Sequence, residues 1–154
     1  MRARPGLIGV CVSLASGATF AGCGAHKLPL SAVCTGDSGP IERAIARAPD
    51  AVRLADGTSI STCVSRALDD GQLQSLGATF TAVADDLAAR APSGDRPAVA
   101  LGYLIGAARR GAAHSNGINA ELVRRLEQEA VPYGAPGPRH AAVDRGIQAG
   151  SRLG

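Results

Sequence analysis

The chain is poor in aromatic residues and in lysine. Its 154 residues include two Phe, two Tyr and no Trp, and only one of its 16 basic residues is Lys. Aromatic side chains are favoured in strands, whereas Ala, which is abundant here, is the best helix former. The composition therefore argues against a β-rich fold and predicts an all-α protein with a core of Leu, Val, Ile and Ala.

Common signatures of enzymes and cofactor sites are also missing. The sequence has no GxSxG, no P-loop and no GxGxxG. It has no CxxC and no Cys/His cluster at zinc spacing, and His26, His114 and His140 lie far apart with no carboxylate at ligand spacing. We therefore expect no catalytic residue, no metal ion, no cofactor and no enzymatic activity.

No run of roughly 20 strongly apolar residues is present, so a conventional spanning helix is not expected. The first residues instead have the three parts of a secretory signal. Arg2 and Arg4 give a positive start, Leu7 to Phe20 is an uncharged apolar stretch, and small residues follow. We expect residues 1–22 to be a signal peptide and the protein to be exported.

The residues FAGC at Phe20 to Cys23 resemble the lipobox of bacterial lipoproteins, although Phe20 stands where that family usually has Leu. The resemblance implies that the signal is cut before Cys23. It further implies that Cys23 becomes lipid-modified and anchors the protein to the outer face of the cell membrane. The alternative is an ordinary signal cut nearby, for instance after Ala25, which would release a secreted soluble protein.

The four cysteines support export independently of the lipobox. Cys11 lies inside the signal, and Cys23 is either lipidated or removed, so Cys34 and Cys63 remain as a pair. In an oxidising compartment this pair is expected to form a disulfide across a loop of about 28 residues, contributing roughly 3 to 4 kcal/mol. The alternative is two buried free thiols.

The net charge of +3 depends on the signal. Removing Arg2 and Arg4 from the 16 basic residues leaves 14, against 13 acidic residues. A mature chain so close to neutral has no electrostatic footprint for nucleic acid, and we expect no nucleic-acid partner.

The mature chain is expected to have three parts. Residues 23–39, rich in Pro, Gly and Ser, predict a lipid-attached tether. Residues 40–131 predict a small bundle of about four helices, and residues 132–154 predict a linker and a weakly helical C-terminal tail. The tail has only Val143, Ile147 and Leu153 to bury, so we expect it to be loosely docked or disordered.

Two helices have the clearest patterns. The helix expected from about Asp70 to Ala91 has apolar residues three and four apart, which predicts one buried stripe. These residues are Leu73, Leu76, Phe80, Val83 and Leu87. The helix expected over 96–113 is apolar nearly all round and should be central. Its Gly102 and Gly106, four residues apart, would let another helix approach closely.

The function expected from these features is binding or structural, with an unknown partner in the cell envelope. The alternatives are a small-molecule or lipid-binding bundle with an apolar cavity, and an envelope enzyme. Two arginine pairs, 109–110 and 124–125, could form an anion patch if their helices are antiparallel neighbours, but solvated helix faces are commoner.

Overall fold

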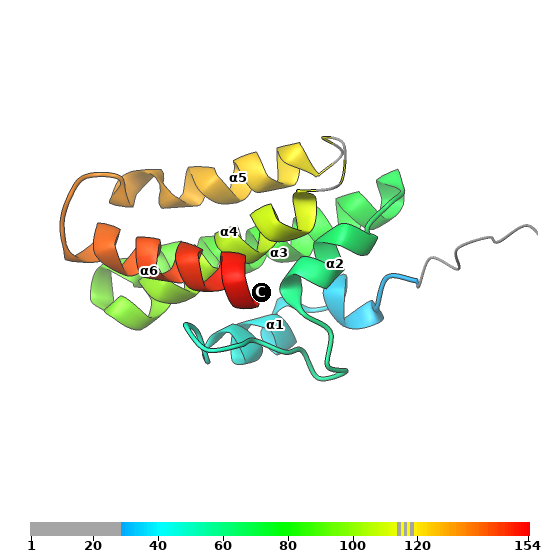
Figure 1. Cartoon of the computed structure of the whole chain (residues 1–154), viewed down its shortest axis with the longest axis horizontal. Coiled ribbons are helices and arrows are strands. Elements are labelled where there is room, and N and C mark those ends of the chain that lie inside the picture. Colours follow the sequence, from blue (N-terminus) through cyan, green and yellow to red (C-terminus); the bar gives the residue numbers. More distant parts are fainter. Residues whose placement is uncertain (1–28, 114, 116, 118) are drawn as a thin grey trace, which may run out of the picture.

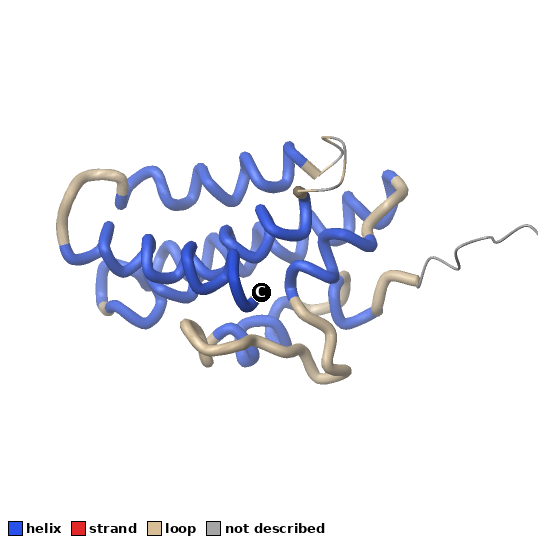
Figure 2. Tube along the Cα trace, viewed as in Figure 1, coloured by secondary structure: helices blue, strands red, loops and turns tan. Residues whose placement is uncertain are grey.

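The computed structural model describes residues 29–113, 115, 117 and 119–154, and in this part of the chain every regular element is a helix (Figures 1 and 2). The α-helices are α1 Ser38–Ile45, α2 Ile60–Arg66, α3 Asp70–Arg90, α4 Asp95–Ala112, α5 Ala120–Ala130 and α6 Pro138–Leu153. Short 3-10 helices are η1 Ala32–Cys34, η2 Ala91–Ser93 and η3 Val131–Tyr133. The predicted all-α fold is confirmed for this part of the chain, which has six α-helices where about four were expected.

Helix α4 is the centre of the molecule, as its pattern predicts. It contacts α1, α2, α3, α5 and α6, and every residue from Ala98 to Ala108 is buried (Figure 1). Gly94 precedes the helix, and Arg109 and Arg110 occupy its last turn, where positive charge favours the C-terminal end of a helix. The other helices bury their apolar faces against this one element.

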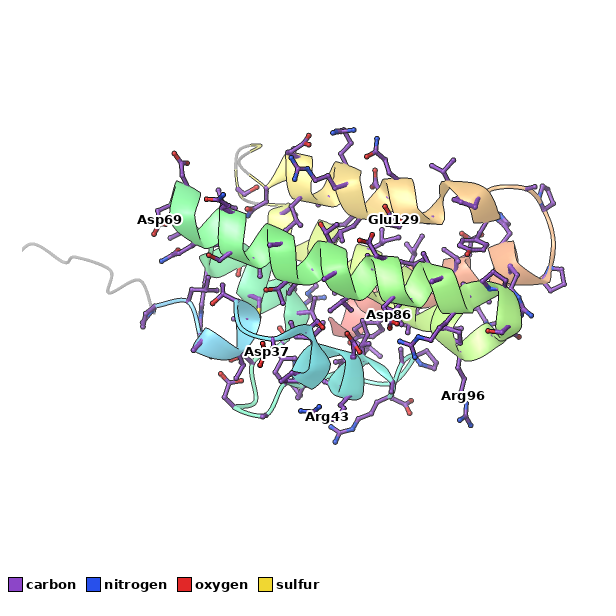
Figure 3. All side chains as sticks on the ribbon, turned by 180° about the vertical axis from the view of Figure 1, so that it is seen from behind. Asp37, Arg43, Asp69, Asp86, Arg96 and Glu129 are labelled. Carbon is purple, nitrogen blue, oxygen red and sulfur yellow. A yellow bond between two sulfur atoms is a disulfide. The ribbon has the colours of Figure 1, made fainter. Side chains whose placement is uncertain are left out.

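Helix α3 begins and buries its residues much as predicted. The carboxylate of Asp69 caps the helix by accepting a hydrogen bond from the backbone N–H of Gln72 at 2.8 Å. Four members of the predicted stripe are buried, whereas Leu73 is only partly covered. Figure 3 shows the molecule from behind, where α3 runs across the surface from the labelled Asp69 past the labelled Asp86. The buried residues of the stripe are Leu76, Phe80, Val83 and Leu87.

Helix α6 overturns the expectation of a loosely docked tail. It lies along α4, and the two helices meet at glycines (Figure 1). A Cβ atom added to Gly102 would lie 2.0 Å from the carbonyl oxygen of Val143, and one added to Gly146 would lie 2.1 Å from that of Val99. The close approach expected at Gly102 is therefore confirmed, and its partner is the segment whose lack of large apolar residues suggested weak docking.

The N-terminal segment also departs from the expected tether at 23–39. Cys34 is fully buried, Leu30 and Val33 pack against the core, and α1 already begins at Ser38. The cause is burial: the apolar side chains of this segment cover the core beside α1 and α3. The folded domain therefore starts several residues before position 40.

The expected linker after residue 132 is also held on the bundle. The hydroxyl of Tyr133, in η3, donates a hydrogen bond to the carbonyl oxygen of Ala88 in α3 at 2.6 Å. In the middle of α4, the buried hydroxyl of Tyr103 accepts a hydrogen bond from the backbone N–H of Val52 at 3.0 Å. These two tyrosines connect irregular segments to long helices, which explains how non-helical chain stays in place.

Candidate functional site

The cysteines that the sequence pairs lie together in the fold. The sulfur atoms of Cys34 and Cys63 are 2.02 Å apart, a disulfide-bond distance, and their Cα atoms are 5.6 Å apart. This pair joins η1 to α2, and both residues are fully buried. Cys63 lies in the first turns of α2. Cys23, the expected lipidation site, lies outside the described residues.

The described surface has a groove of about 740 Å³ with four arginines along it. It runs between the loop before α2, α2 itself, and the C-terminal ends of α4 and α6, around the point marked C in Figure 1. Arg53 comes from the loop, Arg66 from α2, Arg110 from α4 and Arg152 from α6. We call these four residues and their surroundings the arginine groove.

Hydroxyl groups fix the walls of the arginine groove. The side chain of Ser59 caps α2 by accepting a hydrogen bond from the backbone N–H of Thr62 at 3.2 Å. The hydroxyl of Ser61 donates to the carbonyl oxygen of Gly154 at 2.6 Å, and both residues are buried. The start of α2 and the end of α6 are therefore joined at the base of the groove.

One acidic side chain, that of Asp56, lies in the groove lining. It accepts a hydrogen bond from the hydroxyl of Ser31. It accepts two more from Thr58, one from the backbone N–H and one from the hydroxyl, both at 2.9 Å. The Ser31 hydroxyl is the main cause of a pKa of Asp56 below the ordinary 3.8. Asp56 thus stays ionised while its acceptors are engaged by its own loop and by the N-terminal segment.

Arg110 has a structural task in the groove. Its Nη1 donates hydrogen bonds to the carbonyl oxygens of Ser151 at 3.1 Å and Arg152 at 2.8 Å. These carbonyls belong to the last turn of α6, whose final carbonyls have no partner within the helix. Arg110 therefore fastens the end of α6 to α4.

The other three arginines of the groove make no ion pair among the described residues. Arg53 and Arg152 are exposed, and Arg66 is half-buried. Their positions, 53, 66 and 152, are scattered along the sequence between residues of other kinds, so no local pattern indicates that they meet. Sequence reasoning missed this site for that reason.

The anion patch considered for the two arginine pairs does not form. Arg109 pairs with Glu127 at 2.8 Å, and Glu121 binds both Arg124, at 2.7 Å, and Arg125, at 2.9 Å. Hydrogen bonds from these last two arginines, Arg124 first, lower the pKa of Glu121 from 4.5 to about 2. Arg109, Arg124 and Arg125 therefore bind carboxylates of the protein itself in place of an external anion.

A second groove, of about 620 Å³, runs between α3 and α5. Leu73 and Leu122 line it together with small residues of α3, among them Gly77 and Ala78. Polar side chains at its edge include Asp85, Glu121 and Arg125. It is an open surface groove, since the core beside it is filled by Phe80, Leu76 and Leu126, which are fully buried.

Titratable groups elsewhere do not assemble into a metal site. In the part of the chain that the structure describes, no three His, Cys, Asp or Glu residues lie close enough to hold one ion. His140, expected in a linker with no carboxylate at ligand spacing, lies in α6, and the expectation about spacing is wrong: Asp144 follows four residues later with its Oδ2 3.1 Å from Nε2 of His140. The Nδ1 of His140 is 3.1 Å from the carbonyl oxygen of Tyr133. His26 and His114 lie outside the described residues. None of the described helices combines the length and apolarity needed to cross a bilayer.

Comparison of the chain with models of protein families, with curated proteins and with solved structures finds no match in any of the three. What the arrangement can do chemically therefore rests on its own residues. Its grooves offer one surface for an anionic group and one for an apolar group.

Proposed function

We propose that the protein is an exported lipoprotein, held to the outer face of a cell membrane through Cys23, whose helical domain has a binding or structural role in the cell envelope. The observation that carries this proposal is the sequence FAGC at Phe20 to Cys23, directly after a positive start and an apolar stretch. The proposal includes no enzymatic activity, no cofactor and no nucleic-acid partner.

The way in which the domain begins supports the proposal. Only seven residues lie between Cys23 and Ser31, whose hydroxyl donates a hydrogen bond to Asp56, and Cys34 follows three residues later. A covalent link between Cys34 and Cys63 would carry any pull on the tether directly into α2. An attachment point so close to a lipid anchor keeps the domain near the membrane surface.

Replacement of Cys23 tests the anchor. In Cys23→Ala, the protein should leave the membrane fraction of cells that express it, because no residue remains to carry the lipid. Cys11→Ala is the matched control: it removes a cysteine from the same segment and should leave the protein in the membrane fraction. Retention of the Cys23→Ala variant on membranes would show that the lipobox hypothesis is wrong.

A second candidate function rests on the groove between α3 and α5, where an apolar small molecule or a lipid chain could lie against Leu73 and Leu122. An environment-sensitive apolar dye should bind the protein, and Ala78→Trp, which fills the groove, should lower that binding. Ala89→Trp places the same ring on an exposed site of α3 away from the groove and serves as the control. Equal dye binding by both variants would exclude this groove as the site.

A further inference from the structure

The arginine groove concentrates positive charge in a domain whose charged side chains are balanced overall. Of the 16 basic and 13 acidic residues of the chain, Arg2, Arg4 and Lys27 lie outside the described range, which leaves 13 of each. Four of these arginines line the groove, and Asp56 supplies the one acidic side chain of its lining. The rest of the described surface is therefore net acidic, and the charge of this domain is segregated.

Ion pairing sharpens this segregation. The salt bridges of the described residues use arginines on α3, α4, α5 and α6 that do not line the groove. Arg53, Arg66 and Arg152 remain available to an external anion. The guanidinium group is planar and presents its N–H donors as a fork that matches the oxygens of a phosphate, so several such groups around one hollow suit a phosphate-bearing ligand.

The edge of the groove also carries an apolar group. Leu153, the last residue of α6, lines the groove and is 44% exposed. Large exposed apolar side chains are few on the described surface, where Leu68 and Val131 are the others. An apolar side chain beside several arginines matches the surface of a lipid bilayer, where phosphate groups lie next to hydrocarbon chains.

The groove lies next to the attachment of the tether. Asp56, in the groove lining, is hydrogen-bonded to Ser31, so the first described residues start at this side of the domain. Eight residues lead from Cys23 to Ser31, and a fully extended chain of that length spans at most about 29 Å. A lipid on Cys23 would therefore hold the groove within this distance of the headgroups and raise their effective concentration around it.

We propose that the arginine groove binds the phosphate groups of anionic phospholipids, so that the anchored domain lies with this face against the membrane. The inference rests on the proposed anchor at Cys23 for the approach of the groove to the membrane. Arg53, Arg66 and Arg152 contact headgroup phosphates, Arg110 keeps its bonds to the end of α6, and Leu153 faces the boundary with the acyl chains.

Vesicle binding tests the proposal without the anchor. The full chain carrying Cys23→Ala, which has no lipid, is mixed with vesicles of phosphatidylcholine alone or of phosphatidylcholine containing phosphatidylglycerol. We expect clear binding only to the vesicles with phosphatidylglycerol, weakened by added salt. Every variant carries Cys23→Ala and has otherwise unchanged residues 1–28, so the contribution of this segment cancels between variants. Absence of binding to the anionic vesicles would overturn the proposal and leave the anchor untouched.

Paired substitutions locate the binding surface. Arg53→Gln with Arg152→Gln should lower the vesicle partition coefficient about 25-fold, since one basic residue near an anionic surface accounts for about a fivefold change. Arg53→Lys with Arg152→Lys, which keeps the charge, should retain most of the binding. Arg53 and Arg152 are exposed, so these variants should keep the helical circular dichroism of the parent chain.

The control is Arg43→Gln with Arg96→Gln, which removes the same charge from outside the groove. Figure 3 labels Arg43 on α1 and Arg96 at the opposite end of the molecule from Asp69. This control should bind almost as well as the parent chain. If the control pair and the groove pair lose the same amount of vesicle binding, net charge alone drives binding. If inorganic phosphate displaces the protein from vesicles more than chloride does at the same ionic strength, the groove binds a soluble phosphate ion. Either result overturns the proposal.

Discussion

Helix α4 packs against α6 and against α3 in two different ways. Toward α6 it presents glycines, and the two backbones are so close that a Cβ atom on Gly106 would lie 2.2 Å from the carbonyl oxygen of Ile147. Toward α3 it meets large side chains, including the fully buried Phe80 and Leu76. One helix therefore uses backbone contact on one side and side-chain interlocking on the other.

The glycine interface explains how α6, which has few large apolar residues, can still pack firmly on α4. A glycine inside a helix costs roughly 0.5–1 kcal/mol relative to alanine, so the four glycines of this interface weaken both helices taken alone. In return, the close approach brings many backbone atoms into van der Waals contact, a packing mode common among small-residue helix pairs. The four residues are Gly102, Gly106, Gly146 and Gly150.

The largest effect is expected where a side chain is forced into the glycine interface. Gly146→Leu would place its Cβ 2.1 Å from the carbonyl oxygen of Val99 and 2.7 Å from the backbone nitrogen of Tyr103, and a helix backbone cannot move aside locally. We expect a loss of at least about 5 kcal/mol in the free energy of unfolding, beyond the usual 1–3 for overpacking. Urea unfolding and amide exchange of α6 measure it, and a loss below about 1 kcal/mol would contradict this packing.

The side-chain interface should respond to removal of volume instead. Phe80→Ala would leave a cavity between α3 and α4, and we expect a loss of about 4 kcal/mol, within the range for buried phenylalanine. Unfolding by urea measures this loss, and amide exchange should show that α6 remains docked. Release of α6 together with α3 would mean that the two interfaces are not independent.

The third expected effect concerns neither interface. Replacing Cys34 and Cys63 together by Ala should lower the free energy of unfolding by about 3 kcal/mol, because the unfolded chain would lose its cross-link. Intact mass with and without reductant should differ by two hydrogen atoms in the parent chain. Alkylation of Cys34 and Cys63 themselves without reductant, located by peptide mapping, would show that the pair is not oxidised.

A glycine outside the interfaces should behave in the opposite way. No atom lies within 4 Å of a Cβ atom added to Gly77 in α3, so alanine fits there without displacing anything. Gly77→Ala should raise the free energy of unfolding by about 0.5–1 kcal/mol, since alanine is the better helix former. This variant is the matched control for Gly146→Leu, and destabilisation by Gly77→Ala would indicate that the site is tighter than the structure has it.

The smallest expected effect is a pH dependence at α5. The folded pKa of Glu121, about 2, lies below its ordinary value of 4.5, so its stabilisation is complete above about pH 4.5 and is lost as the pH falls through about 2. Carboxyl NMR titration should find this low midpoint, and Arg124→Gln with Arg125→Gln should raise it toward 4.5. The ion pair is exposed, so the accompanying change in stability is expected to be small.

The local pattern of the sequence predicts α3 and α4 well. Their apolar residues recur at helical spacing, and the capping residues Asp69 and Ser59 lie where a polar side chain precedes such a pattern. α6 was wrongly expected to be loose because glycine adds nothing to an apolar count, although Gly146, Gly150 and Gly154 recur every four residues. That recurrence was the available signal, and it matches the spacing noted for Gly102.

The sequence alone determined the helical class, the course of the central helices and the pairing of Cys34 with Cys63, because each depends on residues close in the chain or on simple counting. Tertiary structure alone decided which helix meets Gly102 and that Arg53, Arg66, Arg110 and Arg152 share one groove. The physical reason is that helical periodicity is set by neighbours along the chain. Close backbone approach and the convergence of charges depend on which distant elements come together.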